Sequence, residues 1–156
     1  MIGSLKGQIS DWKYGRGIVL QFLSELSDDD LDKKLPRKQL NTIRLQIKEL
    51  AEIQNHYVNA LTTRKIKFDG GSPVKDKSKQ GLTDFMAELD TKLEETLEAF
   101  DGTETIGWFG ESKNIHEHIS AMIGREQMHI GQIVAFCYAI GIRIPDGITS
   151  TMALDG

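Results

Sequence analysis

The sequence contains one cysteine, Cys137, so no disulfide can form within the chain. A lone cysteine in an apolar helical stretch is typical of a small buried hydrophobic side chain and not of a nucleophile. No run approaches about 18 consecutive apolar residues, and residues 1–11 contain no long apolar run after their positive charge. We therefore expect neither a membrane-spanning helix nor a secretory signal peptide. These absences predict a protein of the cytoplasm, where thiols stay reduced.

The chain also lacks an excess of positive charge. Nineteen Lys and Arg side chains stand against 23 Asp and Glu side chains, which gives a formal net charge of -4. Nucleic-acid binding draws on the counterions that basic side chains release, so we do not expect a nucleic-acid partner. The 156 residues, 39% of them hydrophobic, fit one soluble domain that is stable without a structural metal. Any metal in such a domain therefore serves chemistry.

Strand-type alternation and internal repeats are absent, whereas apolar residues recur at the three- and four-residue steps of a helix. This pattern predicts four long helices, over residues 9–26, 37–62, 80–100 and 115–140. A short helical connector is predicted over residues 28–35. Asn114 and Glu117 match a capping box at the start of the fourth long helix. We expect an all-α single domain, residues 1–156, that folds as a four-helix bundle with one long crossover, residues 63–79. The C-terminal tail, residues 142–156, shows no periodicity and is expected to wrap over one end.

Polar side chains that interrupt the apolar stripe of the fourth helix are the first candidates for a site. At about 100° per residue, Glu126 falls near the middle of the apolar face, His129 at its side and Arg125 on the adjoining edge. A carboxylate and an imidazole three residues apart can converge on one metal ion. The alternative is that Glu126 pairs with an Arg or Lys and that His129 donates to a backbone carbonyl. The second such pair that a di-iron site needs is absent.

The second helix offers further polar candidates. Gln46 and Gln54 lie near its inner stripe, while Glu49 and His56 lie on a flank well over about 90° from the centre of that stripe. A solvated position or one at the bundle edge is the default expectation for the latter two.

The segment before the fourth helix contains Trp108 and Phe109 between two glycines, in an expected loop. Large apolar side chains in such a loop most commonly form a plug over the end of the core, and a substrate lid is the alternative. His116 and His118, at the start of the fourth helix, are expected at the surface and are assigned no role.

Four segments, taken in order and spacing, resemble the DinB-like family of four-helix bundles over nearly the whole chain. They are LSDDDLDKKL, KELAEIQNHYVNAL, LTDFMAELDTKLEETLEAF and REQMHIGQIVAFCYAIGIRIP. The last resembles the closing signature of the family: a His, three residues, a second His, any residue, Gly-Gln, and an apolar run that ends near Gly and Pro.

The resemblance implies one divalent metal held by three histidines, one on the second helix and two on the fourth. Characterised relatives include metal-dependent transferases of low-molecular-weight thiols and an isomerase that uses such a thiol, and many members have no known activity. In this sequence His129 matches the second histidine of the signature. Arg125 stands where the first belongs, and Glu49 aligns with the ligand of the second helix.

Arg125 cannot replace a metal ligand, because a guanidinium is always charged and only donates hydrogen bonds. Two interpretations remain open. In the first, which needs no new geometry and which we favour, Arg125 forms an ion pair with Glu49 and its positive head takes the place of the cation. In the second, Glu126 joins Glu49 and His129 as metal ligands, a mixed set that suits Zn, Ni, Mn or Fe.

Two functions follow as expectations from the resemblance. The first is a divalent-metal-dependent transferase or hydrolase with a degenerate site, acting on a small molecule or a low-molecular-weight thiol. Glu126 is then the third ligand or a general base, and Trp108 and Phe109 lie near the mouth of the cavity. The second is a non-catalytic bundle that binds a small ligand or a partner protein. For both we expect a homodimer through helix faces, and both require His129 to point between the second and fourth helices.

Overall fold

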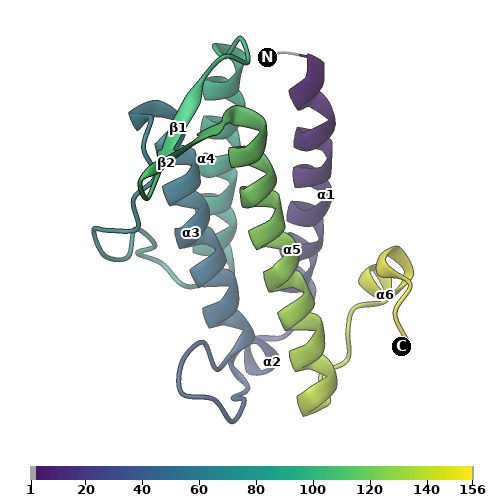
Figure 1. Ribbon diagram of the computed structural model, residues 1–156. Helices are drawn as coiled ribbons and strands as arrows, with labels where there is room; N and C mark the ends of the chain where they lie inside the picture. The colour runs from purple at the N-terminus through teal and green to yellow at the C-terminus, as the bar shows by residue number, and fades with distance from the viewer. Residues whose placement is uncertain (1–2, 156) are drawn as a thin grey trace.

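The computed structural model describes residues 3–155 of the chain and consists mainly of four long helices (Figure 1). These are α1 (Gly3–Glu25), α3 (Ile43–Thr63), α4 (Lys79–Glu98) and α5 (Ile115–Ile140). The shorter elements are α2 (Asp28–Asp32), α6 (Asp146–Met152), β1 (Thr105–Trp108) and β2 (Glu111–Asn114). α5 packs against α1 and α3, and α3 also packs against α4. This arrangement confirms the all-α four-helix bundle.

The ends of the helices follow their capping residues more closely than their apolar stripes. α3 begins at Ile43 and not at residue 37, because the Thr42 side chain caps it by accepting from the Leu45 N–H at 3.1 Å. Leu40, which the stripe counts as helical, has a φ of 49°. α5 begins at the predicted capping box, which is confirmed by the reciprocal side-chain and backbone hydrogen bonds of its N-cap and its third residue.

A β-hairpin before α5 corrects the expectation that the chain contains no strand. β1 and β2 pair antiparallel, so Trp108 ends a strand and does not lie in a loop. Phe109, with a φ of 40°, and Gly110, with a φ of 98°, form the turn. Two-residue hairpin turns need positive φ, which Gly110 adopts freely and Phe109 only with strain. Of the two turn residues, only Gly110 is a sequence signal for a turn. The strands on either side of it are too short to show alternation.

The crossover between α3 and α4 is fixed to this hairpin at its start. The Ile66 N–H donates to the Gly107 carbonyl at 3.0 Å, and the Gly107 N–H donates to the Arg64 carbonyl at 2.9 Å. Further along, the Ser72 hydroxyl donates to the Glu52 carboxylate on α3. The crossover is therefore held against one side of α3.

The core consists of two hydrophobic clusters separated by buried polar side chains. The clusters include Phe22, Leu50 and Ile133 on the side of α2, and Trp12, Leu61 and Met122 on the side of the hairpin. Between them each long helix contributes one side chain to a hydrogen-bonded and ion-paired group: Arg16, Gln54, Asp90 and Glu126. We call these four residues the polar layer.

The C-terminal tail contains one helix, α6, which the absence of periodicity did not predict. Ile148 of α6 is fully buried in the core. The Tyr14 hydroxyl donates to the Thr151 carbonyl at 3.4 Å, and the Tyr138 hydroxyl donates to the Asp155 carbonyl at 2.7 Å. These contacts hold the tail against α1 and α5.

Two predictions, on the role of the single cysteine and on membrane-spanning helices, can be compared with the described residues. Cys137 is buried and free, and burial raises the pKa of its thiol to about 11, which suits a hydrophobic side chain and not a nucleophile. Among residues 3–155, every helix is too short or too polar to cross a lipid bilayer.

Candidate functional site

His129 points into the interface between α5 and α3, where it is 3% exposed. Its Nδ1 lies 3.1 Å from Oε1 of Gln46, and Nε2 of Gln46 donates to the Leu40 carbonyl at 2.9 Å. Because an amide oxygen only accepts, Nδ1 carries the proton, and Nε2 is left with a lone pair. Nε2 has no hydrogen-bond partner among the described residues. The expected backbone partner is thus replaced by a glutamine side chain that fixes the tautomer.

Arg125 lies one helical turn before His129 and is exposed. Burial and then the positive charge of Arg125 lower the pKa of His129, and both favour the neutral imidazole. Arg125 also faces Tyr57 of α3: burial raises the pKa of that hydroxyl, and a hydrogen bond with Arg125 opposes the rise. The proposed ion pair with Glu49 is not formed among the described residues. An exposed guanidinium keeps its hydration and needs no buried counter-ion.

Glu126 belongs to the polar layer. It is fully buried, and one carboxylate oxygen accepts from Nε2 of Gln54. The other oxygen lies 3.7 Å from Nη1 of Arg16. Burial raises the pKa of Glu126 to about 7, and the Arg16 charge opposes that rise. The expectation that Glu126 pairs with an arginine is met, by a residue that the sequence pattern did not select.

Arg16 is the main residue that the sequence analysis missed. Its Nε donates to both oxygens of Asp90, at 3.1 and 3.0 Å, and its Nη2 donates to Asp90 and to Gln54. Trp12 packs on the guanidinium at 4.8 Å and donates from its ring N–H to Asp90 at 3.3 Å. The available signal was a charged residue one turn beyond Trp12, within the apolar stripe of α1.

These positions decide how well the site fits the divalent metal that the fold family implies. The unpartnered Nε2 of His129 is a suitable ligand atom, and its other nitrogen is oriented by Gln46 as in many metal sites. Glu126, however, is engaged by Arg16 and Gln54. Within residues 3–155, no group of three or more His, Cys, Asp or Glu side chains is arranged to hold a metal ion. The residues therefore do not fit a three-ligand centre.

His118 is fully buried and corrects the expectation of a surface position. Its Nε2 donates to the Tyr57 carbonyl at 3.0 Å, and its Nδ1 accepts from the ring N–H of Trp108 at 3.1 Å. Burial lowers the pKa of this imidazole. Trp108 thereby ties the hairpin to α5 and α3, as expected of a plug over the end of the core.

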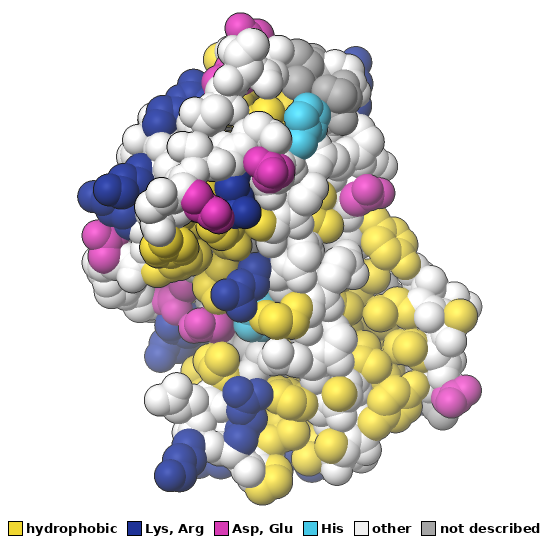
Figure 2. Space-filling model, in the orientation of Figure 1, with side chains coloured by type: hydrophobic (Ala, Val, Ile, Leu, Met, Phe, Trp, Pro, Cys, Tyr) yellow, Lys and Arg dark blue, Asp and Glu magenta, His cyan; other side chains and the backbone are white. Residues whose placement is uncertain are grey.

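Phe109 differs from its neighbour, because it is 72% exposed and packs on Phe68 of the crossover with ring centroids 5.9 Å apart. Figure 2 shows the surrounding face, where hydrophobic side chains near the hairpin lie close to charged side chains over α3 and α5. A substrate-lid role for Phe109 stays a prediction.

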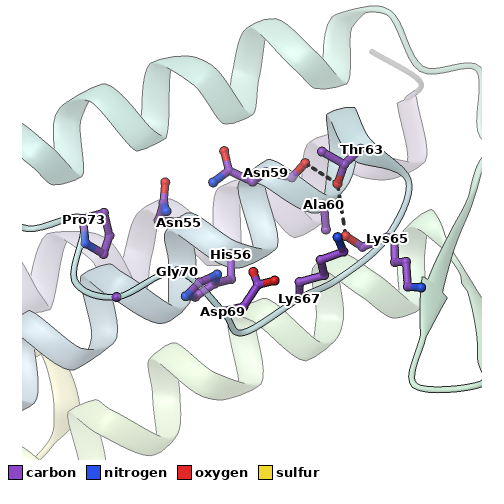
Figure 3. Close-up of a pocket in the computed structure, with 11 residues that line it drawn as sticks. Asn55, His56, Asn59, Ala60, Thr63, Lys65, Lys67, Asp69, Gly70 and Pro73 are labelled. Carbon is purple, nitrogen blue, oxygen red and sulfur yellow. Dashed lines mark hydrogen bonds between the residues drawn. The ribbon is translucent and has the colours of Figure 1, made fainter.

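A pocket of about 220 Å³ lies between α3 and the crossover (Figure 3). We call it the α3 pocket. Its lining includes Asn55, His56, Asn59, Ala60 and Thr63 from α3, and Lys65, Lys67, Asp69, Gly70, Gly71 and Pro73 from the crossover. Neither His129 nor Glu126 lines it. Of the residues that the sequence analysis considered, only His56 does, on the flank where a solvated position was expected.

The fold is that of a DinB-like protein. The crystal structure of a DinB-like protein from Bacillus cereus superimposes on this chain with a TM-score of 0.70 and 19% sequence identity, covering 90% of this chain and 95% of that one. The search with protein-family models found no match, and neither did the search of curated proteins. The DinB-like architecture expected from the sequence is therefore confirmed at the level of the fold.

Proposed function

We propose that this chain is a DinB-like bundle that binds a small molecule in the α3 pocket without catalysing a reaction. The observation that carries the proposal is the pocket itself, which combines a cavity of about 220 Å³ with polar side chains from two segments of the chain. The part of the crossover that covers the pocket is hydrogen-bonded to the hairpin at its start and to α3 through Ser72. A pocket held in this way is largely preformed for a ligand.

The environment of the catalytic candidates supports a non-catalytic role. Glu126, the candidate general base, is fully buried and hydrogen-bonded within the polar layer. A general base must reach the proton that it abstracts, directly or through one water. Arg125 supplies a positive charge near the imidazole of His129, and this charge opposes the approach of a cation. We therefore assign the polar layer a structural role.

A metal-dependent transferase or hydrolase is the second candidate, and the free Nε2 of His129 favours it. His129 and Glu49 would bind the ion, Gln46 would orient the imidazole, and Trp108 and Phe109 would lie near the substrate. A bound divalent metal would supply Lewis-acid activation of a water or thiol. This candidate needs a third donor, and the burial of Glu126 and its contacts with Gln54 and Arg16 make that role hard for it to fill.

Small-molecule binding can be tested by NMR on the ¹⁵N-labelled full chain. Glycerol, lactate, glycerol 3-phosphate and ethanolamine are added separately to the wild type and to Ala60→Leu, which places a larger side chain in the floor of the pocket. We expect at least one compound to shift the amide signals of the pocket lining in the wild type only. The proposal is overturned if none does so. Stoichiometric Zn²⁺ binding that is lost in His129→Ala would support the second candidate instead.

We also propose that the protein is a homodimer that associates through helix faces. Tyr14 of α1, Met128 of α5 and Tyr138 of α5 are large hydrophobic side chains with 51%, 41% and 50% exposure. Figure 2 shows further hydrophobic side chains over the lower part of α5 and over α6. Sedimentation equilibrium of the wild type and of Tyr138→Glu tests this; a monomeric wild type would contradict it. The cytoplasmic location stays a prediction.

A further inference from the structure

We infer that the α3 pocket selects a small organic anion, a carboxylate or a phosphate monoester, that also carries a hydroxyl or ammonium group. This inference rests on the proposed function and specifies its ligand. It follows from the hydrogen-bonding groups that the pocket leaves unused, from the charges at its rim and from its size. Figure 3 shows how the lining residues of α3 and of the crossover face one another across the cavity.

Two polar side chains of α3 that line the pocket, Asn59 and Thr63, already form hydrogen bonds within the protein. The side-chain oxygen of Asn59 already accepts from Nζ of Lys92 at 2.6 Å, so its NH₂ group is what remains for a ligand. The Thr63 hydroxyl lies within hydrogen-bond distance of two carbonyls, those of Asn59 at 3.1 Å and of Lys65 at 3.0 Å. The hydroxyl has one hydrogen, which these carbonyls take up, so Thr63 leaves only its oxygen as an acceptor for a ligand. The NH₂ group of Asn59 therefore suits an acceptor oxygen of the ligand, and the Thr63 oxygen suits a hydroxyl or ammonium group of the ligand.

The Lys67 side chain brings a positive charge to the pocket, and Lys65 adds a second positive charge at its edge. Lys65 and Lys67 both line the pocket, and neither forms an ion pair within the described residues. Arg64, which precedes them, packs on Phe100 at 4.2 Å. A chain with a net charge of -4 thus has a local positive rim at this pocket. Ammonium groups bind carboxylate and phosphate oxygens as point charges.

Asp69 and the cavity size narrow the class of ligand further. Asp69 is the one acidic side chain in the lining, and it forms no ion pair with Lys65 or Lys67. Its carboxylate accepts hydrogen bonds, so it suits a hydroxyl or ammonium group of the ligand. The volume of about 220 Å³ lies below the range of roughly 300–1,000 Å³ of pockets for drug-sized ligands. The ligand is therefore a small metabolite-sized molecule.

The test compares glycerol 3-phosphate and lactate with neutral glycerol, by NMR titration of the full chain at low and at about physiological salt. We expect both anions to bind more tightly than glycerol, and their affinity to fall as salt screens the lysines. Lys65→Gln combined with Lys67→Gln should weaken the binding of both anions by about tenfold or more and leave the binding of glycerol unchanged. The matched control is Lys33→Gln with Lys34→Gln, which makes the same change in net charge at exposed positions outside the pocket.

The outcomes separate the inference from the proposed function. If glycerol or ethanolamine shifts the pocket amides as strongly as the anions do, the pocket binds ligands and only the inference is wrong. The inference is also overturned if both double variants weaken anion binding to the same extent. The net charge of the protein, and not the pocket lysines, would then determine the affinity. If no compound shifts the pocket amides, the proposed function fails as well. The ratio of the affinities for glycerol 3-phosphate and lactate shows whether the pocket prefers a phosphate monoester or a carboxylate.

Discussion

Nη1 of Arg16 on α1 lies 3.7 Å from Oε1 of Glu126 on α5, and neither atom has a hydrogen-bond partner among the described residues. The remaining nitrogens of Arg16 are bonded to Asp90 and Gln54, which come from the other two long helices. The polar layer therefore joins all four helices at one level of the bundle. One guanidinium thus serves two carboxylates, Asp90 and Glu126, so both depend on Arg16 for a counter-charge.

Substitution of Arg16 should be among the most damaging changes in the polar layer. Arg16→Met removes the cation that Asp90 and Glu126 share and the hydrogen bonds to Asp90 and Gln54, and we expect a loss of roughly 3–5 kcal/mol in the free energy of unfolding. Urea denaturation followed by circular dichroism measures this loss. Because the two residues share one network, Glu126→Leu should cost less in the Arg16→Met background than alone, with a coupling of about 0.5–3 kcal/mol. Strict additivity would mean that the pair is not coupled.

Glu126→Gln should make the protein more stable than the wild type at high pH. The pKa of Glu126 is about 7 in the folded state against 4.5 ordinarily. A raised folded-state pKa contributes stability that is fully present below pH 4.5 and is lost as the pH rises through about 7. Glutamine does not ionise, so the variant should gain on the order of 1–3 kcal/mol relative to the wild type between about pH 5 and 8.

Urea unfolding of both proteins at several pH values in this range measures the difference. Glutamine retains the acceptor for Gln54, so lost packing does not obscure the comparison. A stability difference that does not change with pH would show that burial does not raise the pKa of Glu126.

The fold was predictable because helical periodicity and capping are local signals. The stripes of α3, α4 and α5 and the capping box at Asn114 identify the bundle without reference to tertiary contacts. The start of α3 was misplaced because Leu40 continues the stripe, although its φ of 49° ends any helix there. The hairpin was missed because its strands are only four residues each, too short for alternation to be distinguished from a loop.

The candidate site was predictable only in part, since sequence spacing gives the face of a helix but not its partner. Spacing placed Glu126 and His129 inward, and both are buried. It could not show that Glu126 meets Arg16, because that contact depends on how closely α1 approaches α5. Gly15 permits the approach: a Cβ at this position would lie 3.2 Å from Cγ of Glu126 and 2.8 Å from Gln127. From the sequence alone, a glycine within a helix indicates only a less stable helix.

His118→Phe should lower stability and weaken its dependence on acid. The change removes the hydrogen bonds to Trp108 and to the Tyr57 carbonyl, and we expect a loss of about 1–3 kcal/mol at neutral pH. In the wild type, burial lowers the pKa of His118 below its ordinary 6.5. Its contribution to stability is therefore present above pH 6.5 and is lost as the pH falls through the folded-state value.

Thermal unfolding at several values between about pH 5 and 7.5 checks both effects of His118→Phe. Trp108→Phe is the matched control, because it removes one hydrogen bond and keeps the imidazole. The control should lose about 1 kcal/mol and retain the acid dependence of the wild type. An unchanged acid dependence in His118→Phe would assign that dependence to His129, the other imidazole whose pKa is lowered.

Glu49→His combined with Arg125→His should create affinity for Zn²⁺ that exceeds that of the wild type. The double variant removes the positive charge beside His129 and places imidazoles where the family signature has them, while Gln46 still holds His129 with Nε2 free. Isothermal titration calorimetry should give stoichiometric binding, which His129→Ala abolishes and Gln46→Leu weakens by about 10- to 100-fold. If the double variant gains no affinity, Glu49 does not occupy the ligand position of the second helix, and the alignment of α3 with the DinB-like pattern must shift.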